Sequence, residues 1–63
     1  MTLLNTYINT LLEAIQKGIV GKDSPNVPEY IRAVADIMTE LFGGNEYIKQ
    51  WVYEEFENAM REL

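Results

Sequence analysis

The side chains that could do chemistry in this 63-residue chain are few, and most of them are carboxylates. Glu54 and Glu57 are three positions apart, a spacing that places both on one face of a helix. Mg²⁺ and Ca²⁺ need several converging oxygen ligands, and the chain has no Asp-rich loop to supply them. We therefore interpret the two carboxylates as part of a solvated acidic face, and we expect no metal ion and no other cofactor.

Side chains that could carry out nucleophilic catalysis are equally scarce. The chain contains one serine, Ser24 in a predicted turn, and neither histidine nor cysteine, so the usual pairs of nucleophile and base cannot be assembled. Gly43 and Gly44 are followed by Asn45 and Glu46 rather than by Lys and Ser or Thr, which excludes a phosphate-binding loop of the common kind. The sequence thus predicts a protein that is not an enzyme.

Apolar residues recur at helical spacing in three stretches. They predict helices over about residues 2–19, 27–42 and 46–61. Gly18 and Gly21 are expected to bracket the end of the first helix and Gly43-Gly44 to end the second, while Asn26 and Asn45 are expected to cap the second and third. The predicted core stripes are Leu4, Ile8, Leu11, Leu12, Ile15 and Ile19; Ile31, Val34, Ala35, Met38, Leu41 and Phe42; and Ile48, Val52, Phe56, Ala59, Met60 and Leu63. In the second helix, Ile37 falls at the margin of its stripe, and Thr39 falls on the solvent side.

These elements predict an all-α fold, a single domain over residues 1–63 built as a helical hairpin plus a third helix. A chain this short buries only about 60% of the surface that its unfolded form exposes. Disulfides and the usual zinc sites are excluded by its composition, which leaves association with a second subunit as a source of stability. Because each apolar arc is wider than one small core requires, we expect a dimeric helical bundle.

Six residues are candidates for an interface. Tyrosine and tryptophan at the edge of an apolar arc are favoured at protein interfaces, since the ring can be desolvated while the polar tip stays in water. A carboxylate that falls inside the apolar arc of the third helix, Glu55, could pair with Arg32 or Lys49 of another subunit, although it could equally reach water at the edge of the arc. The candidates are Tyr7, Tyr30, Tyr47, Trp51, Glu55 and Met60.

The charge balance restricts the kind of partner. The formal net charge is -5 and the sequence pI is about 4.4. The second and third predicted helices with their glycine turn superficially resemble a helix-turn-helix, but the would-be recognition helix is acidic and would be repelled by phosphates. Direct binding to nucleic acid is therefore not expected.

The sequence as a whole is typical of a small non-catalytic protein-protein interaction module. Its size and acidity resemble those of regulators or inhibitors that phages, viruses and mobile elements direct at a host or viral protein. Two alternatives remain open, namely an acidic DNA mimic or transcription-linked regulator, and a structural adaptor or assembly protein. The N-terminal residues lack the features of a signal peptide and no apolar run reaches membrane-spanning length, so we expect a cytoplasmic protein, in the host cytoplasm if it is viral.

Overall fold

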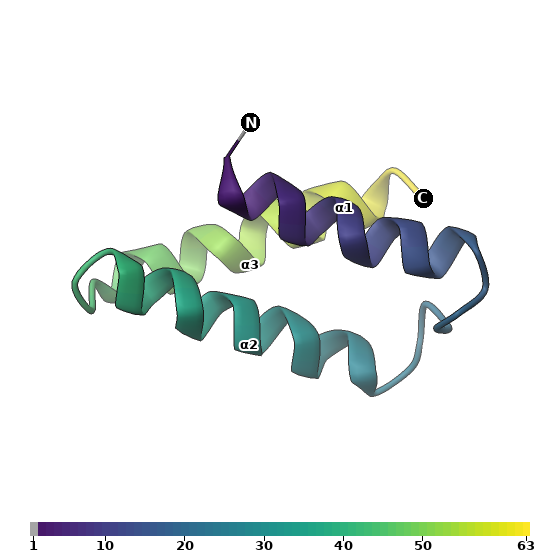
Figure 1. The fold of residues 1–63 in the computed structure, drawn as a ribbon, viewed down its shortest axis with the longest axis horizontal. Coiled ribbons are helices and arrows are strands. Elements are labelled where there is room, and N and C mark those ends of the chain that lie inside the picture. The colour runs from purple at the N-terminus through teal and green to yellow at the C-terminus, as the bar shows by residue number, and fades with distance from the viewer. Residues whose placement is uncertain (1) are drawn as a thin grey trace.

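The structure is a computed structural model in which residues 2–63 are described. It consists of three helices, α1 (Leu3–Gln16), α2 (Asn26–Leu41) and α3 (Glu46–Arg61), with no strand in this part of the chain. Figure 1 shows α2 running opposite to both α1 and α3, so that α2 and α3 form a hairpin and α1 packs along it. The two hairpin helices share most of the contacts between helices. The predicted all-α fold of three helices is confirmed.

Short polar side chains cap the N-termini of α1 and α3. The hydroxyl of Thr2 accepts a hydrogen bond from the amide of Asn5 at 3.2 Å, and the side-chain oxygen of Asn45 accepts one from the amide of Tyr47 at 3.0 Å. The predicted cap at Asn45 is therefore confirmed. Asn26, in contrast, is the first residue of α2 rather than its cap, and its amide donates to the hydroxyl of Ser24 at 3.2 Å.

Glycines with left-handed backbone end the first two helices, as predicted. Gly43 and Gly44 have φ of 77° and 81°, and the amide of Gly44 donates to the carbonyl of Thr39 at 2.8 Å. Gly18 has a φ of 75° and ends α1 in the same way, so the chain turns away before Ile19. The prediction that the first helix reaches residue 19 is wrong, because α1 ends at Gln16 and Ile19 is 75% exposed.

The core lies where the three helices meet. Tyr30 of α2 connects all three, because its ring packs edge-on against Phe56 of α3 and its hydroxyl donates to the backbone carbonyl of Tyr7 in α1 at 2.8 Å. The ring centroids of Tyr30 and Phe56 are 6.1 Å apart, which is within the range of favourable aromatic pairs. The buried apolar residues are Leu4, Ile8, Leu11, Val27, Val34, Ala35, Met38, Val52 and Phe56. The prediction of Leu63 in the core stripe of the third helix is wrong, because α3 ends at Arg61 and Leu63 is 43% exposed.

Three residues of α2 and its end depart from their predicted positions. Leu41 and Phe42 were expected in the core but are 62% and 55% exposed. Figure 1 shows the reason, since the α2–α3 turn extends beyond the N-terminal end of α1, and no third helix among residues 2–63 lies against the turn there. Thr39 was expected on the solvent side but is buried, and its hydroxyl donates to the carbonyl of Ala35 at 2.7 Å. That bond satisfies the hydroxyl within its own helix and allows the burial.

Tyr30→Phe tests the connection at the core. Removing a hydroxyl that donates to a backbone carbonyl should lower the free energy of unfolding by about 1 kcal/mol near neutral pH. Burial raises the pKa of Tyr30 above its ordinary value of 10.0, the charge of Tyr7 acts in the same direction, and a hydrogen bond from Thr10 opposes both. The folded state thus holds the hydroxyl proton of Tyr30 more tightly than the unfolded state does. The stabilisation from this group is therefore present below the pKa of the unfolded state and is lost as the pH rises from there through the pKa of the folded state.

Urea unfolding of the parent and of Tyr30→Phe, at about pH 7 and about pH 11, measures this contribution. The difference in free energy of unfolding between the two proteins should shrink at the higher pH. Because the other titrating groups are common to both proteins, their effects cancel in the difference. A difference that stays constant would show that the Tyr30 hydroxyl has no pH-linked role in the fold.

Candidate functional site

Five large apolar side chains lie exposed around the α2–α3 turn, and we call them the hairpin-end surface. Ile37 and Leu41 are four positions apart on α2, Tyr47 and Trp51 are four positions apart on α3, and Phe42 ends α2 between them. Their exposed fractions are 42%, 62%, 82%, 38% and 55% respectively. On each helix the spacing of four positions aligns the two side chains one helical turn apart.

The backbone holds these side chains in place. Gly43 and Gly44 reverse the chain within two residues and Asn45 starts α3, so the end of α2 and the start of α3 remain adjacent. Ile37 and Leu41 lie on the same face of α2 as Tyr30 and Val34. It is from this face that the hydroxyl of Tyr30 contacts α1. They therefore face the side on which α1 packs, at the end that α1 does not reach.

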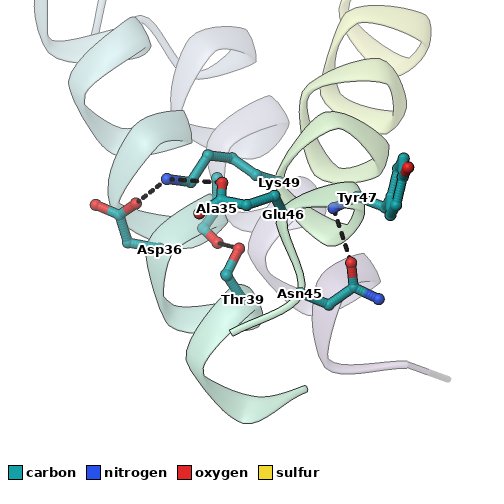
Figure 2. Close-up of polar contacts among 7 residues, drawn as sticks. All are labelled: Ala35, Asp36, Thr39, Asn45, Glu46, Tyr47 and Lys49. Carbon is teal, nitrogen blue, oxygen red and sulfur yellow. Dashed lines mark hydrogen bonds and ion pairs between the residues drawn. The ribbon is translucent and has the colours of Figure 1, made fainter. Parts of the chain in front are cut away.

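The start of α3 presents its two flanks differently. Figure 2 shows Lys49 directed toward α2, where its ammonium group lies 3.5 Å from Asp36 and 3.8 Å from Glu46. The ring of Tyr47 points away from α2. The only basic residue near the turn is thus engaged by two carboxylates, and Tyr47 is left free for an external contact.

Acidic residues surround the hairpin-end surface. Residues 36–58 hold six of the ten acidic residues and one of the five basic residues, which gives this segment a net charge of -5. The remaining residues hold four acids and four bases and are neutral as a group. Glu57 pairs with Arg61, just outside this segment, at 3.2 Å, so the charge closest to the turn is that of residues 36–55, where five acidic residues and Lys49 give a net charge of -4.

The structure divides the predicted interface residues into separate groups. Tyr47, Trp51 and Glu55 follow one another at four-residue spacing along one flank of α3. Glu55 is partly buried and has no ion-pair partner within residues 2–63, while Lys49, one of its two proposed partners, is engaged within its own chain. An interface role for Glu55 stays a prediction.

The other candidates lie apart from this flank. Tyr7 and Tyr30 meet where α1 packs on α2, and both are partly buried against the core. Met60 is partly buried near the far end of α3. Their contacts within the chain leave less of their surface available to a partner than Tyr47 has.

Sequence reasoning missed Ile37, Leu41 and Phe42 as surface residues. Each fits the apolar stripe of α2 or its margin, and the stripe alone does not say how far along a helix its neighbours extend. Helix lengths gave no signal either, because the sequence predicts a first helix over about residues 2–19, whereas α1 has 14 residues and α2 has 16.

Two shallow grooves flank the helices. One of about 450 Å³ lies between α2 and α3 and is lined by Pro28, Glu29, Arg32, Asp36, Lys49 and Tyr53. The other, of about 340 Å³, lies between α1 and α2, with Ile19, Val20, Val27 and Tyr30 among its lining residues. The first groove is lined mostly by charged side chains of both signs, and the second is mainly apolar.

Comparison with models of protein families, with curated proteins and with solved structures finds no match to this chain. Within residues 2–63, no helix is long and apolar enough to cross a membrane, and no three acidic side chains group as metal ligands would. The function is therefore inferred from the exposed side chains themselves.

The paired substitutions Phe42→Ala and Phe56→Ala test the placement of the hairpin-end surface. Phe56 is 1% exposed, so its truncation should lower the free energy of unfolding by about 3–5 kcal/mol. Phe42 is 55% exposed, and its truncation should cost less than about 1 kcal/mol. Thermal unfolding followed by circular dichroism compares the two variants. Equal losses would place Phe42 in the core.

Proposed function

We propose that this chain is a small non-catalytic protein-interaction module that acts through the hairpin-end surface. The observation that carries the proposal is that Ile37, Leu41, Phe42, Tyr47 and Trp51 are exposed and belong to the parts of α2 and α3 nearest their connecting turn. Side chains of this size have about 150–250 Å² of surface each, so the five together expose roughly 400–700 Å². That is roughly 9–16% of the total 4490 Å², and it approaches the area of about 800 Å² that one partner contributes to an ordinary protein interface.

The effect of such a module would come from occupying a surface of its partner, as regulators, inhibitors and adaptors do. Mimicry of DNA is less favoured, because basic side chains interrupt the acids of α3. Arg61 pairs with Glu57 at 3.2 Å, and Lys49 lies beside Asp36 and Glu46. Covering exposed apolar side chains with a complementary protein surface, in contrast, lowers the free energy of the system and so favours binding.

We also propose that the module forms a homodimer through its remaining surface. Leu3, Ile19 and Leu63 lie outside the hairpin-end surface and are 47%, 75% and 43% exposed. Outside residues 36–58 the acidic and basic residues balance, so a second copy can approach there without the repulsion that two hairpin ends would cause. A second subunit would also supply the burial that a chain this short lacks.

Light scattering after gel filtration tests the dimer. At about micromolar concentration the mass should be near twice 7.3 kDa, at both low and high salt, because the contact is electrically balanced. The double variant Leu41→Ser/Phe42→Ser should have the same mass, since it changes only the hairpin-end surface. A monomer at all concentrations would refute dimerisation, and a monomer only in the variant would place the dimer contact at the hairpin end.

A further inference from the structure

The hairpin-end surface combines two properties that together specify the chemistry of its partner. Its five apolar side chains need a partner that also presents apolar side chains. Residues 36–55 around it have a net charge of -4, and their one basic residue, Lys49, is already engaged by Asp36 and Glu46. Glu40, next to Leu41, and Glu54 and Glu55, beyond Trp51, have no ion-pair partner within residues 2–63. Basic side chains on the partner would complement them.

The shape of the uncovered region points to a helix. Along most of the hairpin, α1 packs against α2 and α3, and Tyr30 marks that contact by donating to the carbonyl of Tyr7. Toward the turn α1 is absent, although the stripe of Tyr30 and Val34 continues through Ile37 and Leu41. Residues spaced by one helical turn form ridges against which another helix can pack. A helix placed in line with α1 would cover the part of the hairpin that α1 leaves open.

We propose that the hairpin-end surface binds a basic amphipathic helix of another protein, with apolar side chains on one face and lysine or arginine at its edges. This inference rests on the proposed function and names the class of partner for the same surface. A second copy of this chain fits less well, because residues 36–55 of each copy bring a net charge of -4 and two such ends repel. In a basic helix the same charges attract the partner and accelerate its association.

The test uses two synthetic peptides of about 18 residues, long enough to form a helix on binding. One has leucine and lysine in an amphipathic helical pattern, and the other has glutamate in place of each lysine. Trp51, the only tryptophan of the chain, lies in the surface and reports binding by its fluorescence, while calorimetry gives the dissociation constant. We expect the lysine peptide to bind with a dissociation constant that rises with salt, and the glutamate peptide not to bind.

Three variants separate the apolar contribution from the charge contribution. Leu41→Ser/Phe42→Ser keeps the net charge and should weaken binding of the lysine peptide at least about tenfold. Tyr53→Ser removes an exposed aromatic side chain that belongs to neither proposed surface and should change the dissociation constant by less than about twofold. Glu40→Gln/Glu54→Gln removes two carboxylates without an ion-pair partner within residues 2–63, and it should weaken binding about threefold and reduce its dependence on salt.

Several outcomes would overturn the proposal. Undiminished binding by the Leu41→Ser/Phe42→Ser variant would show a general attraction between opposite charges, and equal binding of both peptides would show that charge does not select the partner. If neither peptide binds, the proposed partner class is wrong. Loss of the dimer in Leu41→Ser/Phe42→Ser would assign the surface to a second copy instead. The mass measured by light scattering is independent of the peptides, so failure of this proposal and failure of the proposed dimer can be told apart.

Discussion

One side chain, Tyr30, joins α1 to the hairpin by a directional contact. Its ring contacts Phe56 of α3 and its hydroxyl donates to the carbonyl of Tyr7 in α1, so one residue of α2 is held by both other helices. This hydrogen bond and the close packing of the buried residues Leu4, Ile8 and Leu11 together fix the position of α1 along the hairpin. With α1 fixed at Tyr7, its first residue lies short of the α2–α3 turn, and the apolar side chains near that turn remain uncovered.

Local features of the fold follow well from the sequence. Helix periodicity predicts the three helices, and glycine and asparagine predict their ends, because left-handed backbone at Gly18, Gly43 and Gly44 and a capping oxygen at Asn45 are short-range effects. The same chemistry explains the error at Ile19. Its apolar character fits the stripe of the first helix, but Gly18 turns the backbone one residue earlier, and the side chain leaves that stripe.

The candidate surface was less predictable, because it depends on where helices lie relative to one another. Tyr47 and Trp51 could be recognised as exposed from their place at the edge of an apolar arc. Leu41 and Phe42 could not, since a stripe that is buried at Val34 and exposed at Leu41 has the same periodicity throughout. The buried Thr39 is the converse case, where a polar residue enters the core because its hydroxyl bonds to a carbonyl of its own helix.

Exposed apolar surface carries a cost for a protein of this size, because side chains that stay in water contribute little to a small core and favour aggregation. The acidic residues around the hairpin end reduce that second cost, since like charges keep two such ends apart. The same charges would not repel a basic partner. A surface that is apolar at its centre and acidic around it therefore discriminates between partners by repulsion as well as by attraction. In this chain the apolar side chains and the acidic residues occur together at the end of the hairpin that α1 does not cover.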